Sequence, residues 1–438
     1  MPLRPRLEQY FQFKPLGARW RTEILAGFTT FMTMAYIIFV NPAILHETGM
    51  PLAAVTAATC ISAAAGSFLM GGLANYPIAL APGMGLNAYF TYSVVKGMGV
   101  PWQVALGAVF VSGVAFLLLT LVGVRQLILS AIPFELYAAV AAGVGLFIAL
   151  IGFRNSGIIV PSSATLVTLG HLGERSTALA LFGLLLIAAL LAWRVRTAIL
   201  IGILATTAVG LVTGVAKWTP QSYHLSDLSA TAGKLDLAGT MKIGFVEIVF
   251  VFLFIDLFDN IGTLVAVGKK ANLFNEARQI PRINRILVSD AIATIVGSLT
   301  GTSTVVSYIE SAAGVAAGGR TGITAIVAGL LFLIALFIAP VVGVIPASAT
   351  APALIVVGSL MASVMGEIAW HDPEVAVPAF LTVMTIPLSF SIANGLAFGF
   401  TAYSLIKILR GRFREVNWFV YLLTALFLAR FVYLANAG

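Results

Sequence analysis

Apolar runs long enough to cross a lipid bilayer follow one another along almost the whole chain. Of its 438 residues, 60% are hydrophobic and 10% are charged, whereas a soluble domain has about 45–50% apolar and about 25% charged residues. A transmembrane helix needs about 20 mostly apolar residues. The sequence therefore excludes a soluble globular domain and a disordered chain, and it predicts a protein that lies mostly inside a membrane.

The apolar runs can be divided into fourteen spans, each bounded by charged residues, Gly or Pro. We place these spans at residues 22–45, 52–73, 77–95, 101–123, 133–151, 177–193, 197–216, 244–267, 286–300, 303–317, 321–341, 347–366, 374–389 and 390–409. A further segment at 416–434 carries Trp418 and Arg430 and indicates an interfacial helix. The predicted fold class is an all-α polytopic membrane protein.

The net charge of +8 has to be interpreted together with the topology, because Lys and Arg mark cytoplasmic loops. A cytoplasmic N-terminus places 18 of the 25 basic residues inside, six outside, and Arg430 in the terminal segment. We therefore expect a multi-pass protein of the cell (inner or plasma) membrane, in contact with lipid, with both termini in the cytoplasm. No nucleic-acid partner is expected, because the basic residues do not form a soluble face.

Other sequence features exclude several kinds of site. Residues 1–21 contain no apolar core followed by a cleavage site, so we expect a cytoplasmic N-terminal segment and no cleaved signal peptide. The single cysteine, Cys60, cannot form an intramolecular disulfide. The four histidines have no ligand-like spacing, so we expect neither a metal site nor a cofactor.

Two of the spans are interrupted. The third contains Pro77, Pro82, Gly83 and Gly85, and the tenth becomes helix-like only after Glu310. Unpaired backbone groups are costly in lipid, so such segments persist only where they are buried or line a cavity. Each is the third span of a seven-span half, and interrupted spans at matching positions of two inverted halves mark a transporter binding site. A kinked structural helix is the alternative.

Three acidic residues lie inside apolar spans: Asp256 and Asp259 in the eighth and Glu310 in the tenth. A carboxylate at the bilayer centre costs about 2.5–3.5 kcal/mol and marks a functional site by default. Asp256 and Asp259 share a helix face, where desolvation and repulsion disfavour the charged form, so one could exchange a proton near neutral pH. A polar lock between helices is the alternative. Asp290 lies nearer a span end and indicates an ion pair or helix cap.

Four motifs give the chain a family resemblance over residues Thr22 to Arg410. It resembles the AzgA-like branch of the nucleobase cation symporter 2 family, purine permeases for hypoxanthine, guanine and adenine in the xanthine/uracil permease superfamily. The motifs are FTTFMTMAYIIFVNPAIL (28–45), APGMGLNAYFTY (81–92), FVFLFIDLFDNIGTL (250–264) and GTSTVVSYIESAAG (301–314).

The resemblance implies a seven-plus-seven inverted repeat and a homodimer. It implies short extended stretches in spans 3 and 10 that meet at the substrate site. It also implies core and gate domains that move against each other in alternating access. The implied segments are a core domain at 22–123 and 244–341, a gate domain at 133–216 and 347–409, and the interfacial helix at 416–434.

The resemblance also implies roles for the acids. Glu310 is expected to bind the purine edge with help from the backbone of Tyr308 and Ile309. Asp256 and Asp259 both match acids of this branch, so one is expected to bind substrate. Proton coupling is expected from Asp259, Asp256 and Glu310.

At the third span, Asn87 matches a polar residue of the family, and the Ala88 amide is an expected backbone contact. Relatives have an aromatic residue where this chain has Ala88. Tyr89 and Phe90 follow, so the ring that stacks on the base is left open, with Phe90 among the expected binding residues.

This chemistry suits a purine, because carboxylates accept from its N–H groups and amides donate to its ring oxygen or nitrogen. The sequence therefore predicts a secondary active transporter that imports purines by proton symport, and not an enzyme. Two other functions are alternatives to purine import. An anion transporter of the same architecture would present positive helix ends or Arg at the breaks. A membrane-embedded enzyme would need catalytic groups, for which only the aspartate pair qualifies.

Overall fold

The computed structural model describes residues 3–123, 132–220, 225–242, 245–271 and 281–437. The chain divides into two compact units. Unit 1 contains Met1–Leu118 and Gly152–Val356, and unit 2 contains Leu119–Ile151 and Val357–Gly438. The expected division into core and gate domains stays a prediction, and the expected start of the eighth span at Gly244 lies outside the described residues.

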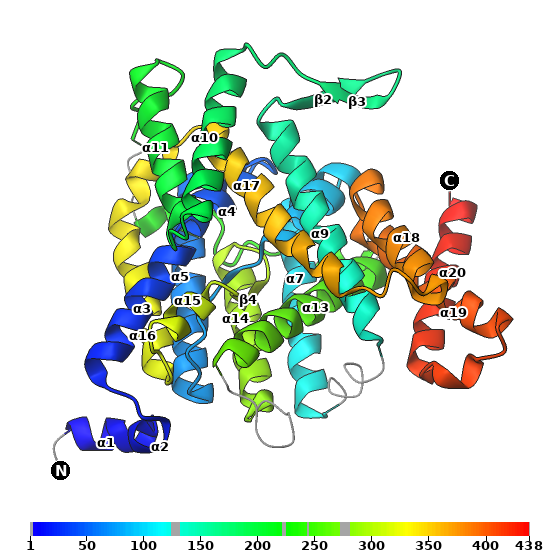
Figure 1. The fold of residues 1–438 in the computed structure, drawn as a ribbon, viewed down its shortest axis with the longest axis horizontal. Helices are drawn as coiled ribbons and strands as arrows, with labels where there is room; N and C mark the ends of the chain where they lie inside the picture. Colours follow the sequence, from blue (N-terminus) through cyan, green and yellow to red (C-terminus); the bar gives the residue numbers. More distant parts are fainter. Residues whose placement is uncertain (1–2, 124–131, 221–224, 243–244, 272–280, 438) are drawn as a thin grey trace. The chain divides into compact units, whose positions relative to one another are not determined.

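Unit 1 carries most of the helices and all four short strands of the described chain. Figure 1 shows these elements coloured along the sequence. Its first half contains α1 (Leu3–Tyr10), α2 (Phe13–Leu16), α3 (Trp20–Met34), α4 (Ile37–His46), α5 (Leu52–Leu69), η1 (Met70–Ala74), β1 (Leu80–Pro82), α6 (Met84–Ala88) and η2 (Tyr89–Gly97). Its remainder contains β2 (Ile159–Ser162), β3 (Leu166–Leu169), α10 (Arg175–Ala192), α11 (Ala198–Val212), η3 (Leu225–Ala230), α12 (Leu237–Lys242), α13 (Phe245–Ala271), α14 (Ile283–Thr300), β4 (Val305–Ser307), α15 (Ser311–Ala316), α16 (Gly322–Ala335) and η4 (Leu336–Val344).

The described secondary-structure elements of unit 2 are all helices. Its elements are η5 (Ser363–Glu367), α18 (Pro373–Ser389), α19 (Ile392–Leu409), η6 (Phe413–Glu415) and α20 (Trp418–Ala437). Among the described helices, three contribute residues to both units, namely α7 (Trp102–Leu121), α9 (Phe134–Asn155) and α17 (Ala347–Ala362).

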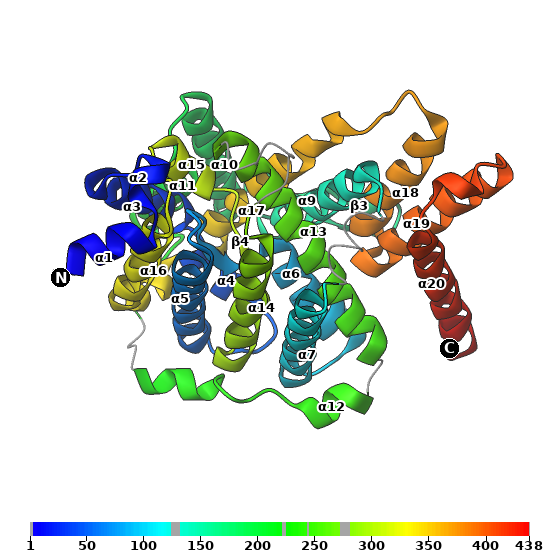
Figure 2. The ribbon, with the colours of Figure 1, turned by 90° about the horizontal axis from the view of Figure 1, so that it is seen from below.

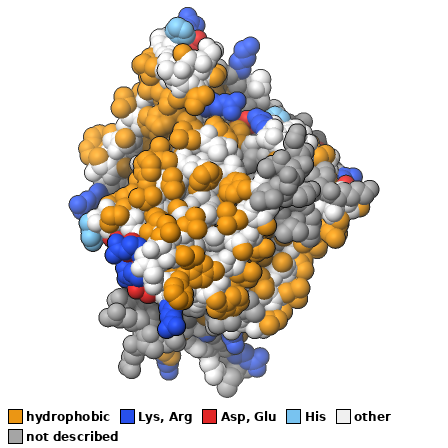
Figure 3. Space-filling view, turned by 90° about the vertical axis from the view of Figure 1, so that its right-hand side faces the viewer, with side chains coloured by type: hydrophobic (Ala, Val, Ile, Leu, Met, Phe, Trp, Pro, Cys, Tyr) orange, Lys and Arg blue, Asp and Glu red, His pale blue; other side chains and the backbone are white. Residues whose placement is uncertain are grey.

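The helices confirm a mostly helical, multi-pass membrane protein. Within the described residues, eight helices are long and apolar enough to cross a membrane, and shorter apolar helices such as Gly322–Ala335 and Pro373–Ser389 accompany them. Hydrophobic side chains cover much of the face in Figure 3. Such exposure suits lipid contact, because large apolar patches are rare on soluble monomers. The number of fourteen spans stays a prediction.

The interruptions expected in the third and tenth spans are confirmed. In the third span β1 leads into α6, and in the tenth β4 leads into α15. The two strands pair antiparallel, with Leu80 opposite Ser307 and Pro82 opposite Val305. Figure 2 places β4 among the helices of unit 1, and Leu80 and Val305 are fully buried. The extended stretches therefore satisfy their backbone groups against each other inside the protein, as a membrane requires.

Each broken span is also supported by a hydroxyl from the helix before it. The Ser67 hydroxyl of α5 accepts from the Leu80 amide at 3.1 Å and donates to the Leu80 carbonyl at 3.3 Å. The Thr294 hydroxyl of α14 accepts from the Val305 amide at 3.3 Å and donates to the Val305 carbonyl at 3.1 Å. The helices α5 and α14 correspond to the second span of each expected half. In both halves, therefore, a hydroxyl of the second span binds the backbone of the broken third span.

Contacts between span ends agree with helices that alternate in direction. At one end, Glu47 pairs with Lys96 and accepts from Tyr92 at 2.6 Å, which joins the ends of the expected first and third spans. At the other end, Glu23 of α3 accepts from the Arg320 amide at 2.8 Å, which joins the starts of the expected first and eleventh spans. In both cases the joined ends belong to odd-numbered spans, as an alternating arrangement requires.

The start of α16 packs closely against η1. A Cβ at Gly322 would collide with the carbonyl oxygen of Gly71. The buried Asn75 side chain accepts from the Gly322 amide at 2.7 Å and donates to the Phe11 carbonyl at 3.1 Å. Gly322 therefore permits an approach that a side chain would prevent, and Asn75 ties the N-terminal segment to this contact.

In unit 2, α18 and α19 lie side by side (Figures 1 and 2), and an ion-pair network joins their ends. The buried Glu374 carboxylate contacts Lys407 at 2.7 Å, Arg412 at 2.9 Å and Arg410 at 3.2 Å. Hydrogen bonding by Arg412 lowers the pKa of Glu415 in the following turn. The start of one expected span and the end of the next therefore lie together, as an antiparallel helix pair requires.

The sequence analysis assigned no element between the fifth and sixth expected spans. There β2 and β3 form an antiparallel hairpin, with Ile159 opposite Leu169 and Ser162 opposite Leu166. The Ser162 hydroxyl accepts from the Ala164 amide at 3.3 Å and so stabilises the turn. The segment is too short for a span, and its β-branched residues favour the extended conformation.

Candidate substrate-binding site

The first part of the candidate site is the turn between β1 and α6. The Gly83 amide donates to the Thr304 carbonyl at 2.9 Å. A Cβ added at Gly83 would lie 2.9 Å from Val306 Cγ2 and 3.5 Å from Asp259 Oδ2. The Asp259 carboxylate of α13 therefore faces this turn, and Gly83 lets the backbone approach both the other strand and the acid.

Glu310 occupies the second break, between β4 and α15. Its carboxylate accepts from the Tyr36 hydroxyl at 2.6 Å, and its carbonyl accepts from the Thr33 hydroxyl at 3.4 Å. The structure therefore places Asp259 at the first break and Glu310 at the second, and it adds Tyr36, which the sequence analysis did not single out.

The backbone groups expected beside Glu310 differ in availability. The Tyr308 amide donates to the Ala79 carbonyl at 3.1 Å, and the Tyr308 hydroxyl donates to the Pro82 carbonyl at 2.5 Å. The Ile309 side chain is 53% exposed, and its amide makes no hydrogen bond within the described residues. Tyr308 therefore holds the strand pair together, whereas the Ile309 amide can still donate.

Asn87 is fully buried in α6, where its side-chain oxygen contacts the Ser303 hydroxyl. Its Nδ2 has no hydrogen-bond partner within the part of the chain that the structure describes, and the same holds for the hydroxyls of Thr304 and Ser307. Buried polar groups without partners are rare and call for an explanation, such as a ligand or water. Ala88 is the last residue of α6, so its amide points back along the helix toward the residue four before it.

The two aromatic candidates are both buried. The Tyr89 ring lies edge-on to Phe252 of α13 at 5.0 Å between centroids, and the Phe90 ring is tilted toward Phe252 at 6.4 Å. Neither ring is exposed in this structure, so the ring that stacks on a ligand stays a prediction.

Asp256 has different partners from Asp259, although the two acids are three residues apart. Asn260 donates to Asp256 Oδ1 at 2.9 Å and to Asp290 Oδ2 at 2.5 Å. Asp290 is fully buried, seven residues beyond the first residue of α14, so the interpretation of Asp290 as a helix cap is wrong. Sequence reasoning missed Asn260, although it directly follows Asp259.

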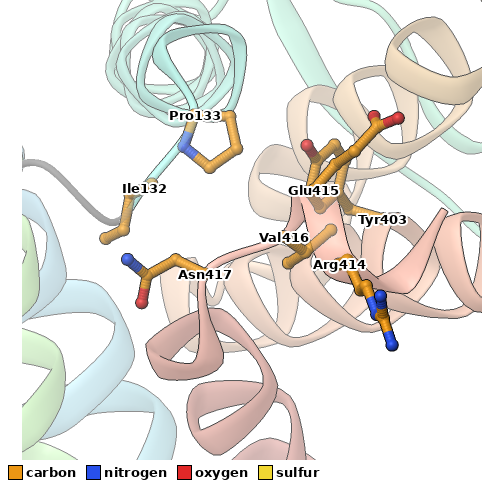
Figure 4. Close-up of a pocket in the computed structure, with 7 residues that line it drawn as sticks. All are labelled: Ile132, Pro133, Tyr403, Arg414, Glu415, Val416 and Asn417. Atoms are coloured by element: carbon orange, nitrogen blue, oxygen red, sulfur yellow. The ribbon is translucent and has the colours of Figure 1, made fainter.

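A separate pocket of about 520 Å³ lies in unit 2 (Figure 4). None of the predicted site residues contributes to it. Its lining consists of Ile132, Pro133, Tyr403, Arg414, Glu415, Val416 and Asn417. Within the described residues, no group of three or more His, Cys, Asp or Glu residues is arranged to hold a metal ion.

Comparison with known proteins assigns the family. The model of a family described as "Permease family" matches residues 21–429. The chain belongs to this family. It is 43% identical to the adenine permease AdeP of Escherichia coli K12, over 98% of this chain and 96% of that protein. It is 44% identical to the guanine/hypoxanthine permease PbuG of Bacillus subtilis, over 98% of this chain and all of that protein. Members of this family are transporters, not enzymes.

Solved structures confirm the fold of this permease. The transmembrane domain of the cyanobacterial bicarbonate transporter BicA matches 88% of this chain and 98% of that domain, with a TM-score of 0.65 at 14% identity. SLC26A9 matches 93% of this chain and 69% of that protein, with a TM-score of 0.64 at 9% identity. The permease therefore has the inverted-repeat transporter fold that the sequence predicted.

Proposed function

We propose that this permease imports purine nucleobases across the cell membrane by proton symport. The single observation that carries the proposal is the pair of carboxylates at the two broken spans, Asp259 facing Gly83 and Glu310 held by Tyr36. The relatives named as adenine and guanine/hypoxanthine permeases support the same substrate class, at 43% and 44% identity over nearly the whole chain.

In this proposal Glu310 accepts hydrogen bonds from the N–H groups on one purine edge. The Ile309 amide and the Asn87 side-chain nitrogen donate to ring acceptors such as O6 or N7. Both donors lack hydrogen bonds to the described residues, which supports this role. Phe90 or Tyr89 would stack on the ring after a movement that exposes it, and stacking contributes about 1–3 kcal/mol per base.

Proton coupling is assigned to the same region of unit 1. Asp259 lies beside the substrate position and interacts with Glu310. A proton on Asp259 would relieve the repulsion between these carboxyl groups, so proton and purine binding would favour each other. Because coupling between two binding events is reciprocal, a proton gradient can then drive purine accumulation. Asp256 and Glu310 remain further candidates for the coupling group.

The remaining proposed features follow from the topology. Lys and Arg gather in the loops that become cytoplasmic if the N-terminus is inside. We assign both termini to the cytoplasm, the helix α20 to the membrane interface, and transport to alternating access of the core against the gate domain. A homodimer is proposed from the family resemblance.

Anion transport is the second candidate, because BicA is a bicarbonate transporter and murine SLC26A9 is an anion transporter. These structures are only 9–14% identical to the chain, however, and so inform the fold alone. The described side chains at the breaks are the carboxylates of Asp259 and Glu310 and the amide of Asn87. The carboxylates repel an anion, and the amide supplies no positive charge to balance it. The purine proposal is therefore preferred.

Uptake by a permease-deficient bacterial host separates these candidates. Cells that express the chain should accumulate radiolabelled hypoxanthine, guanine or adenine, and excess unlabelled purine but not bicarbonate should compete. Glu310→Gln should weaken the apparent affinity, whereas the exposed Glu367→Gln serves as a matched control and should not. Absence of uptake for all three purines, at verified expression, would refute the proposal.

A further inference from the structure

A single buried amide joins three elements of unit 1. The Asn260 Nδ2 of α13 donates to Asp256 Oδ1 at 2.9 Å and to Asp290 Oδ2 of α14 at 2.5 Å. Its Oδ1 accepts from the Ser307 amide of β4 at 3.2 Å. The side chains of Asp256, Asn260 and Asp290 are at most 1% exposed. The nitrogen of this amide therefore donates to two acids, and its oxygen accepts from β4, the strand that leads to Glu310.

We propose that Asn260 is a positioning residue for transport, which transmits the protonation state of the Asp256 and Asp290 carboxyl pair to β4. The inference rests on the proposed function and deepens it, because it names the residues through which a proton would act on the substrate site. Neither Asn260 nor Asp290 is proposed to contact the purine.

The chemistry of the amide gives the reason. Two carboxylates within hydrogen-bond distance of one nitrogen repel each other in a medium of low dielectric, so uptake of one proton is favoured when the site is open to water. A carboxyl group that gains a proton is a weaker acceptor than a carboxylate, and its hydroxyl becomes a donor. The hydrogen bonds that hold Asn260 Nδ2 then weaken, and the amide is free to shift or turn.

A shift of Asn260 reaches the substrate site over a short distance. Its oxygen holds the amide of Ser307, which lies opposite Leu80 in the strand pair and three residues before Glu310. Loss of this hydrogen bond would release the C-terminal end of β4, which leads into the break at Glu310. Protonation would therefore alter the position of the residues that bind substrate, without any contact between the proton and the purine.

Other titratable groups on the surrounding elements have to be considered with this pair. The elements that pack on α13 and α14 include α5, α6, η1, α12, β1, β4 and α15. The described titratable side chains on or beside these elements are Cys60, Tyr76, Tyr89, Asp236, Asp259, Arg282, Arg285, Tyr308 and Glu310. Asp259 is the other candidate for the proton-binding group, and a pH effect on affinity that persists in Asp290→Asn would assign the coupling to Asp259 instead of the Asn260 junction.

The test measures hypoxanthine affinity of the purified full-length protein by equilibrium binding at about pH 6 and about pH 8. In the wild type, affinity should fall by about fivefold or more toward the higher pH, which is the smaller end of typical coupling. Asn260→Ala and Asp290→Asn should reduce this pH effect to within about twofold, while the affinity at about pH 6 changes by less than about threefold, because the coupling and not the purine contact is lost.

A matched control variant distinguishes a loss of coupling through Asn260 from a general loss of stability. Asn75 is another buried amide that bridges two backbone groups, Phe11 O and Gly322 N, and its described hydrogen bonds include no acid. Asn75→Ala should lower thermal stability and keep the pH effect on affinity. If Asn75→Ala also removed the pH effect, the role assigned to Asn260 would be overturned.

The remaining outcomes are equally decisive. If Asn260→Ala does not fold, Asp290→Asn has nearly the same shape as the wild type and decides alone. A pH effect that persists in Asp290→Asn, or an affinity lost at every pH, would overturn the inference. A wild type that binds hypoxanthine with no pH effect would overturn the inference and leave purine binding intact, whereas a wild type that binds no purine would overturn both.

Discussion

The hydrogen bond from Tyr36 to Glu310 gives the sharpest single-residue prediction. Tyr36→Phe removes one hydroxyl and leaves the ring, so the packing around this fully buried side chain is nearly preserved. The lost bond is a short one to a carboxylate, at 2.6 Å. Hydrogen bonds to charged groups contribute about 1.5–3 kcal/mol.

This energy can be converted into an expected change in purine affinity. In the proposed function, substrate binding needs Glu310 charged and correctly oriented, and the hydrogen bond from Tyr36 stabilises that form. The apparent affinity falls with the fraction of protein in the competent form. Because each 1.4 kcal/mol corresponds to a factor of about ten, Tyr36→Phe should weaken purine binding by about tenfold to a hundredfold, with little effect on expression.

The chain offers a control of nearly identical chemistry. The Tyr92 hydroxyl donates to the Glu47 carboxylate at 2.6 Å, at a span end and not at the two breaks. Tyr92→Phe should therefore change thermal stability without changing the dissociation constant, measured by equilibrium binding of radiolabelled hypoxanthine to purified protein. Equal losses of affinity in Tyr36→Phe and Tyr92→Phe, or no loss in Tyr36→Phe, would refute the reasoning.

Three further predictions concern packing, coupling and the repeat. Gly322→Ala should lower the free energy of unfolding by about 1–3 kcal/mol, because the added methyl group forces the two backbones apart. Thermal unfolding measures this loss, and Gly72→Ala is the neutral control, because a Cβ at Gly72 has no neighbour within 4 Å. Asp259→Asn should abolish the dependence of uptake on the proton gradient; uptake that still collapses with an uncoupler would move the coupling to another group. Ser67→Ala and Thr294→Val should each destabilise the protein by about 1–3 kcal/mol, because each leaves buried backbone groups of a strand unsatisfied; a large effect in one and none in the other would contradict equivalent roles in the two halves.

Much of the architecture could be predicted from the sequence, because lipid restricts the choices so strongly. Long apolar runs can only be spans, and the Pro and Gly residues near Pro82 and the hydroxyl residues before Glu310 can only interrupt a helix where protein covers them. The structure confirms both interruptions as β1 and β4. Their register, Leu80 opposite Ser307, depends on contacts between distant segments and could not be derived from either segment alone.

The candidate site was predicted less completely. Acids could be singled out because a charge in an apolar span is costly. Their partners could not, because spacing along a helix does not say which neighbouring helix each side chain meets. Asp256 and Asp259 were expected on one face, yet Asp256 meets Asn260 and Asp259 meets the turn at Gly83. Tyr36 was missed because an aromatic residue in an apolar run gives no sign that its hydroxyl binds an acid.

Reconstituted transport tests the central claim most directly. Purified protein in liposomes should accumulate radiolabelled hypoxanthine, guanine or adenine above the external concentration when the outside is more acidic, and an uncoupler should release the excess. Protons should enter together with the purine, as an internal pH indicator would record. Accumulation that ignores the proton gradient, or the absence of uptake for all three purines, would contradict the account.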